Sequence, residues 1–175
     1  MKTDEEIAQL VQSGNFELFE ILVQRYEAKI KRYSRKFLFK NEEAKDALQD
    51  IFIKAYKNIN SFDSKQKFSP WIYRIAHNEL INAIKKRKKT FPLPDLDTFL
   101  PSYEKREYES KKATKEIIDK SLNSLEVKYK EVIVLYYQES LSYKEIADVL
   151  QIPISTVGVR LKRAKKIIKQ TYDTI

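Results

Sequence analysis

The chain has very few of the residues that make tight turns. Only two glycines and five prolines occur among its 175 residues. Sheet proteins need many tight turns, and those turns depend on Gly, Asn and Pro. The scarcity of turn formers, together with many Lys, Glu, Leu and Ile residues, therefore predicts an all-α protein. Because 42% of the residues are hydrophobic, the chain has enough apolar side chains to build a packed core.

The overall charge points to an anionic partner. The formal net charge at pH 7 is +9, and a basic surface attracts nucleic acid or an anionic membrane. No apolar run approaches the roughly 20 residues that span a bilayer. The segment Met1–Glu6 is too polar and acidic for a secretory signal. We therefore expect a cytoplasmic protein without membrane insertion.

No constellation of residues predicts catalysis or a cofactor. The chain has no Cys, which excludes disulfides and thiolate metal sites. Its one histidine, His77, has no neighbouring ligand with which to hold a metal. No Gly-rich phosphate loop or nucleophile motif is present. We expect no catalytic residue, no metal and no cofactor, and hence a protein that is not an enzyme.

Two blocks with helical periodicity flank one irregular stretch. The first block, residues 1–89, is expected to hold four helices, which begin near Thr3, after Gly14, near Asn41 and at Ser69-Pro70. Residues 90–110 begin with a proline-containing, non-periodic run and are expected to form a flexible linker. Residues 111–175 form the second block. It should contain a polar helix near residues 111–124, a helix that ends before Ser140 and two shorter helices.

The last two helices have the pattern of a helix-turn-helix motif. Ser142 and Glu145 can form a capping box at the start of the first. Pro153 stops that helix, and Ser155 can cap the second. A short helix, a tight connection and a second helix are the elements of a helix-turn-helix.

The second of these helices has one apolar and one basic face. If Val157, Leu161 and Ala164 face inward, the remaining side chains are free to contact duplex DNA, base edges first and phosphates later along the helix. The outward-facing set is Ser155, Thr156, Val159, Arg160, Lys162, Arg163 and Lys166. The alternative is an ordinary helical hairpin with a solvated basic face.

The fourth helix and the loop before it combine amides, cations and aromatics. Amides are good partners for bases, a cation cluster suits phosphates, and aromatic rings stack on unpaired bases. The helix carries Arg74, Asn78, Asn82, Lys85 and Lys89 on one face. The loop and the first turn of the helix add Phe62, Lys65, Lys67, Phe68 and Trp71. These residues predict a site for single-stranded nucleic acid; the alternative is that Phe68 and Trp71 belong to the core and the lysines are merely solvated.

The third helix has an acidic face in this basic protein. Asp46, Gln49, Asp50 and Ile53 share the face opposite its apolar stripe. An acidic patch with an exposed Ile suits a protein partner better than DNA. A solvated face with one stray apolar residue is equally compatible with the sequence.

Two motif blocks resemble one known family. The first comprises residues 46–52, Phe62-Asp63 and residues 68–78. The second comprises residues 141–147, residues 155–157 and residues 160–164. Together they resemble the RNA polymerase sigma factors of the extracytoplasmic-function group of the sigma-70 family, over nearly the whole chain.

The resemblance implies a fold, a function and partners. It implies a four-helix sigma-2-like domain and a helix-turn-helix sigma-4-like domain, and an alternative sigma factor that directs promoter-specific transcription initiation. The implied partners are core RNA polymerase (its beta-prime clamp helices and beta flap), promoter DNA and an anti-sigma factor. The linker would pass near the RNA exit path of the polymerase.

The resemblance also implies roles for residues. Asp46, Gln49, Asp50 and Phe52 occupy the family's polymerase-contact positions, and Ile53 shares their face. The loop of residues 61–68 and the helix with Asn78 and Asn82 would melt and read the minus-ten element, while the second domain would read the minus-thirty-five element. The chain departs from the family pattern at Gly158-Val159, where a cation and then Ser usually precede the Arg.

Two other functions compete with this interpretation. The first is a stand-alone helix-turn-helix transcriptional regulator with a sensing or dimerisation domain. Such a regulator needs neither the acidic face of residues 46–50 nor an aromatic loop. The second is a nucleic-acid enzyme, which the missing catalytic constellation disfavours.

Overall fold

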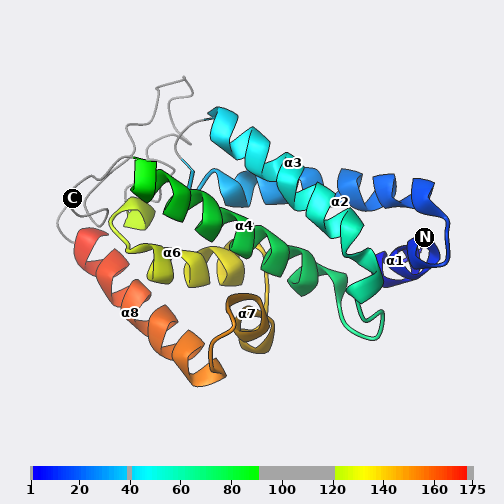
Figure 1. The fold of residues 1–175 in the computed structure, drawn as a ribbon. Helices are drawn as coiled ribbons and strands as arrows, with labels where there is room; N and C mark the ends of the chain where they lie inside the picture. Colours follow the sequence, from blue (N-terminus) through cyan, green and yellow to red (C-terminus); the bar gives the residue numbers. More distant parts are fainter. Residues whose placement is uncertain (1, 39–40, 91–120, 173–175) are drawn as a thin grey trace, which may run out of the picture. The chain divides into compact units, whose positions relative to one another are not determined.

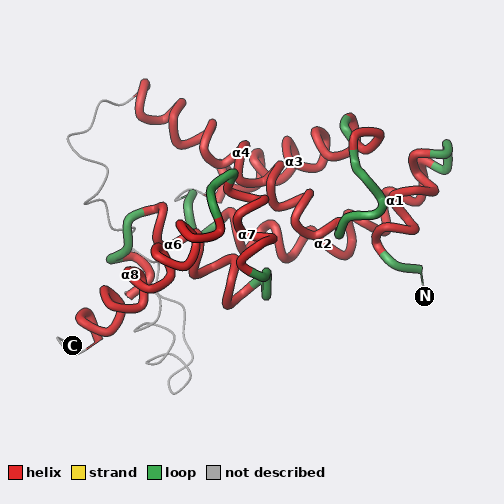
Figure 2. Tube along the Cα trace, turned by 90° about the horizontal axis from the view of Figure 1, so that it is seen from below, coloured by secondary structure: helices red, strands yellow, loops and turns green. Residues whose placement is uncertain are grey.

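The computed structural model describes residues 2–38, 41–90 and 121–172. Helices and loops make up all of this part of the chain, and no strand occurs in it (Figure 2). The prediction of an all-α protein is therefore confirmed. None of the described helices combines the length and apolar character that crossing a lipid bilayer requires.

The chain divides near Pro92 into two compact units. The helices of the first unit are α1 (Asp4–Gln12), η1 (Phe16–Leu18), α2 (Phe19–Ser34), α3 (Asn41–Lys57), η2 (Ile59–Ser61) and α4 (Phe68–Thr90). The helices of the second are α6 (Val127–Ile133), the π-helical segment η3 (Val134–Gln138), α7 (Tyr143–Leu150) and α8 (Ile154–Tyr172), except that the segment Asp148–Gln151 at the end of α7 is assigned to the first unit. The residues of the predicted linker beyond Thr90, and most of the predicted helix at 111–124, lie outside the described residues.

Helices α2, α3 and α4 surround the core of the first unit. Helix α3 packs against both α2 and α4, and runs alongside α4 in Figure 1. The predicted apolar stripes meet in this core, where Ile30, Ile51, Ile72 and Leu80 are at most 2% exposed. Burial of aliphatic side chains of this size contributes about 1.5–3 kcal/mol each. Because the hydrophobic faces of these helices are buried in the core, their polar faces lie on the outside of the unit.

The helix starts near Thr3 and Asn41 follow the prediction, and the start of α4 differs from it. Thr3 forms a capping box with Glu6: its Oγ1 accepts from the Glu6 N–H at 3.2 Å, and Glu6 Oε2 accepts from the Thr3 N–H at 2.8 Å. Helix α3 begins at Asn41, whose side-chain oxygen accepts from Arg35 at 3.0 Å. Helix α4 begins at Phe68, one residue before the predicted start at Ser69-Pro70. The carboxylate of Glu5, from α1, caps the helix at Phe68.

Two aromatic residues of the first unit lie on the surface. Phe16 is 58% exposed and Tyr56 is 43% exposed. The Tyr56 ring packs edge-on against Phe19, with 5.2 Å between ring centroids, and Phe16 covers it at 6.4 Å. Both rings pack against a neighbour and still remain accessible to solvent. Helical periodicity alone does not distinguish such a ring from a buried one.

The second unit contains the predicted helix-turn-helix. Ser142 and Glu145 form the predicted capping box, in which Glu145 Oε2 accepts from the Ser142 N–H at 2.7 Å. Gln151 takes a left-handed conformation, with φ of 53°, and ends α7. Helix α8 then begins at Ile154, where the Pro153 carbonyl accepts from Thr156. The predicted cap at Ser155 is therefore wrong: Ser155 is the second residue of α8, and Pro153 is the residue that precedes the helix.

Candidate nucleic-acid and protein interfaces

The outer face of α8 carries the residues predicted to meet duplex DNA. Val157, Leu161 and Ala164 are buried, with at most 1% exposure. The predicted inward and outward faces of this helix are therefore confirmed. On the outer side, Ser155, Val159, Lys162, Arg163 and Lys166 are exposed, and Thr156 and Arg160 are half-buried. This face combines cations with small side chains near the helix start, an arrangement that can enter a major groove.

Tyrosines flank this basic face within the second unit. Arg163 donates to the Tyr129 hydroxyl at 3.4 Å, a long and therefore weak hydrogen bond. Lys165 lies over the Tyr137 ring, 5.5 Å from its centroid. A hydrogen bond to Tyr137 raises the pKa of Lys165.

The loop before α4 differs from the prediction in its aromatic residues. Phe62 and Phe68 are 4% and 1% exposed, and their ring centroids are 5.4 Å apart. The expectation that both rings stand free to stack on bases is wrong, because they form part of the core beneath the loop. Trp71 is half-buried and packs against both rings at 5.3 Å. The exposed part of the loop consists of polar residues, including Lys65 and Lys67.

The polar face of α4 continues from this loop. Asn78, Asn82 and Lys85 are exposed, and Arg74 is half-buried. The spacing of four residues between the two amides puts them one turn apart on the same face. The side chain of Lys89 lies outside the described residues. Loop and helix together offer a row of cations and amides along one side of the first unit.

The face of α3 opposite the core is acidic and partly apolar. Asp46, Gln49 and Asp50 are exposed, Ile53 is 42% exposed and Phe52 is half-buried. Neither carboxylate has an ion-pair partner among the described residues. The exposed Tyr56 extends this surface, which the sequence interpretation missed. Its position three residues after Ile53 was the signal, since residues at that spacing share a helix face.

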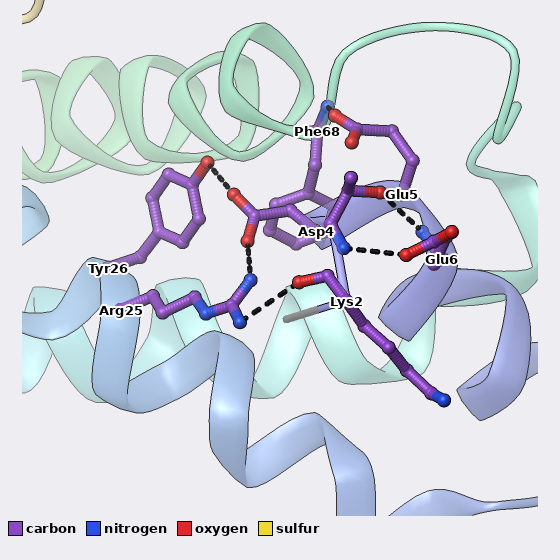
Figure 3. A network of polar contacts seen from close by, with 8 residues as sticks. Lys2, Asp4, Glu5, Glu6, Arg25, Tyr26 and Phe68 are labelled. Carbon is purple, nitrogen blue, oxygen red and sulfur yellow. Dashed lines mark hydrogen bonds and ion pairs between the residues drawn. The ribbon is translucent and has the colours of Figure 1, made fainter.

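A network of polar contacts fixes α1 to the rest of the first unit. Asp4 bridges α1 and α2: it pairs with Arg25 at 2.5 Å and accepts from the Tyr26 hydroxyl at 2.7 Å (Figure 3). Burial and the hydrogen bond to Asp4 raise the pKa of Tyr26, so this phenol remains a neutral donor. Glu5, the next residue, accepts from the backbone N–H of Phe68 at 2.9 Å. No motif in the sequence predicted this network.

Comparison with known proteins identifies both units. The model of sigma-70 region 2 matches residues 22–90, and that of sigma-70 region 4 matches residues 115–168. The ECF RNA polymerase sigma factor SigW of Bacillus subtilis is 34% identical over an alignment that covers 91% of either chain. The chain belongs to the extracytoplasmic-function group of sigma factors. The ECF RNA polymerase sigma-E factor of Haemophilus influenzae is 31% identical to this sigma factor, over 99% of this chain and 97% of that one.

Solved structures agree on the fold of this sigma factor. CnrH, solved in complex with the cytosolic domain of CnrY, matches with a TM-score of 0.76 and 24% identity, over 99% of each chain. The sigma factor RpoE of Bartonella quintana, solved with the anti-sigma factor NepR, matches with a TM-score of 0.76 and 22% identity. That match covers 89% of this chain and 96% of RpoE. As a member of this family, the protein is a transcription initiation factor and not an enzyme. The comparisons give no support to a stand-alone regulator.

Proposed function

We propose how this sigma factor divides promoter-specific initiation among three surfaces. The α3 face binds core RNA polymerase, the loop before α4 and the polar face of α4 capture the minus-ten element, and α8 reads the minus-thirty-five element. In this proposal residues 1–89 and 111–175 are the two functional domains, and residues 90–110 link them. The main support for this proposal is that two helices of the first unit present different surfaces. Helix α3 has an acidic and partly apolar face, and α4 has a face of cations and amides.

The acidic face of α3 is suited to a protein partner. Its carboxylates, Asp46 and Asp50, would be repelled by DNA, and the exposed Ile53 and half-buried Phe52 offer apolar area. An interface with an apolar centre and a charged rim is typical of specific protein contacts. We assign this face to the beta-prime clamp helices of the polymerase, with Gln49 in the same row.

The minus-ten element is captured by polar groups more than by aromatic ones. Phe62 and Phe68 are buried, so neither ring face is available for stacking. Lys65 and Lys67 in the loop and Lys85 on α4 can hold the backbone, with Arg74 beside them. Asn78 and Asn82 can hydrogen-bond to base edges once the duplex has opened, and the accessible part of Trp71 can contact a base.

The minus-thirty-five element is read as duplex by α8. Ser155, Thr156 and Val159 lie in its first turns, where a recognition helix meets base edges. Arg160 follows and can bond bidentately to a guanine. Lys162, Arg163 and Lys166 lie where they can contact phosphates. Gly158 has no side chain, so this position adds no side-chain contact to the DNA.

Two further partners and a location follow from this assignment. We propose that an anti-sigma factor holds this protein inactive, because RpoE of Bartonella quintana was solved bound to the anti-sigma factor NepR. We also propose that the second unit contacts the beta flap. Because the function requires RNA polymerase and promoter DNA, we assign the protein to the cytoplasm.

Run-off transcription with core polymerase on a randomised promoter library tests the proposal. The wild-type protein should bind core enzyme without any other factor and select promoters with two conserved blocks. Selection of a single upstream block would contradict the minus-ten role. Binding to DNA without core polymerase, and no initiation with it, would favour a stand-alone regulator.

A further inference from the structure

Helix α1 holds both ends of the 3-10 turn η2 that leads into the loop. The side-chain amide of Gln12 donates to the carbonyl oxygens of Ile59 and Phe62, both at 2.7 Å. Both amide hydrogens are used, so a single side chain fastens the whole turn to α1. Gln12 is half-buried, which limits competition from water for these bonds.

The other end of the loop is fastened by the first turn of α1. Glu5 accepts from the backbone N–H of Phe68, the first residue of α4 (Figure 3). The first N–H groups of a helix have no carbonyl partner inside it, and a carboxylate also suits the positive end of the helix dipole. Glu5 therefore fixes the residue at which the loop stops and α4 begins. Asp4 keeps α1 itself in place through Arg25 and Tyr26.

The segment between these anchors is a compact, exposed turn, residues 63–67. The Lys65 N–H donates to Asp63 Oδ1 at 3.0 Å, and the Gln66 N–H donates to the Asp63 carbonyl at 2.9 Å. The buried rings of Phe62 and Phe68 lie at its two ends. Local bonds thus set the shape of the turn, while α1 sets its position relative to α4.

We propose that α1 is a positioning element for minus-ten recognition, with Glu5 and Gln12 as the residues that hold the 63–67 turn ready for unpaired bases. This inference rests on the proposed function of the loop. No part of α1 lies within residues 22–90, which match sigma-70 region 2. A loop that is already ordered binds without the entropic cost of ordering. Releasing the 63–67 turn from α1 should therefore weaken binding to the minus-ten strand more than binding to an unrelated strand.

The test uses the full chain assembled with core polymerase. Two labelled single strands are compared: the minus-ten strand that the wild type selects from a randomised pool, and the same bases scrambled. Glu5→Met and Gln12→Met keep side chains of similar length and remove the acceptor and the donor. The double variant should bind the selected strand on the order of tenfold more weakly, a change of the size that a loss of three hydrogen bonds can produce. Its binding to the scrambled strand and to core polymerase should not change.

Two variants separate positioning from a general loss of stability. Glu5→Gln keeps an oxygen that can accept from the Phe68 N–H, and should bind the selected strand like the wild type. Glu6→Met with Gln9→Met removes exposed polar groups of α1, including the Glu6 carboxylate that accepts from the Thr3 N–H, without touching the loop. This control should retain the preference for the selected strand. An equal loss in this control, or no loss in the Glu5→Met and Gln12→Met variant, would overturn the inference.

Hydrogen exchange of the wild-type holoenzyme gives an answer that does not depend on any variant. The Phe68 amide should exchange slowly because Glu5 accepts from it. Fast exchange at this amide would overturn the inference even if a variant failed to fold. A wild-type holoenzyme that prefers no single strand would instead refute the minus-ten role itself, and the inference would fall with it.

Discussion

Gly158 of α8 faces the ring of Tyr143 at the start of α7. A β-carbon at residue 158 would lie 3.7 Å from Cε2 of Tyr143, an ordinary van der Waals separation. The glycine is therefore not required by close packing. The position carries no side chain with which α8 could contact a partner.

Gly158→Ala should stabilise α8. Glycine in a helix interior costs about 0.5–1 kcal/mol relative to alanine, and the added methyl group would make a normal contact with Tyr143. Hydrogen exchange of the α8 amides in the full chain would measure the change, since it reports on this helix even if the two units unfold separately.

The same substitution at Gly14 should have the opposite effect. Gly14 has a φ of +105°, a conformation that residues with a β-carbon rarely adopt, although nothing lies within 4 Å of the added carbon. Gly14→Ala should therefore destabilise the first unit, by about 1 kcal/mol or more. If both variants shifted stability in the same direction, backbone conformation would not be the cause.

Reversing the charge of the α3 face should abolish polymerase binding without unfolding the protein. Gln49→Lys with Asp50→Lys changes only exposed side chains, so the core remains intact. Opposed like charges at the centre of an interface cost several kcal/mol. Co-purification with core polymerase measures the loss, and circular dichroism checks the fold.

A variant with the same change in charge provides the control. Glu20 and Gln24 are exposed on α2, where Gln24 donates to Glu20 at 3.2 Å. Glu20→Lys with Gln24→Lys should retain polymerase binding. Equal loss in both variants would show that net charge, and not the α3 face, controls the association.

The sequence predicted the fold well where periodicity and capping decide it. The buried stripe of α8 and the capping box of Ser142 and Glu145 follow from local chemistry, which sequence spacing reports directly. The start of α4 was misplaced because its cap is Glu5, 63 residues earlier in the chain. A contact made through tertiary structure leaves no local signal at Ser69.

The candidate sites were less predictable than the fold. The exposure of polar residues such as Asn78 was predicted correctly, because the apolar face on the opposite side of the helix indicates which residues point outward. The burial of aromatic residues was not predicted, since Phe62 and Phe68 lie at the two ends of a loop without periodicity, and Tyr56 and Phe16 pack edge-on at the surface. A ring can serve core or surface equally well, and only the surrounding structure decides.

Removing the arginines of α8 should separate base reading from phosphate binding. If Arg163 contacts a phosphate, Arg163→Ala should weaken binding to all duplex sequences and lower the salt slope by about one unit. If Arg160 reads a base, Arg160→Ala should relax preference at one position by about 1–3 kcal/mol. Both are measured by titrating holoenzyme with duplex promoters at several salt concentrations.

Lys169→Ala is the matched control for both arginine variants. Lys169 is exposed in the last turn of α8, so its loss removes the same charge far from the start of the recognition helix. It should change binding less than Arg163→Ala. Unchanged promoter discrimination in Arg160→Ala would remove this residue from the base-reading set.

The amides of α4 should act after polymerase binding, when the duplex opens. Duplex DNA hides its base faces, so a factor that opens it must trap bases once they unstack. Asn78 and Asn82 are exposed one turn apart, and alanine favours the helix more than asparagine does, so Asn78→Ala with Asn82→Ala should keep the fold. The variant should assemble with core polymerase normally in a filter-binding assay, but show reduced permanganate reactivity of the promoter thymines.

Exposed amides elsewhere in the same unit distinguish this role from general surface polarity. Gln9→Ala with Gln24→Ala removes two exposed amides, from α1 and α2, and should leave promoter opening unchanged. Loss of opening with Asn78→Ala and Asn82→Ala alone would support base capture by α4, because both variants lose the same chemical groups. Normal opening in the asparagine variant would instead mean that the amides are ordinary surface residues, and that the loop and its cations hold the open strand without them.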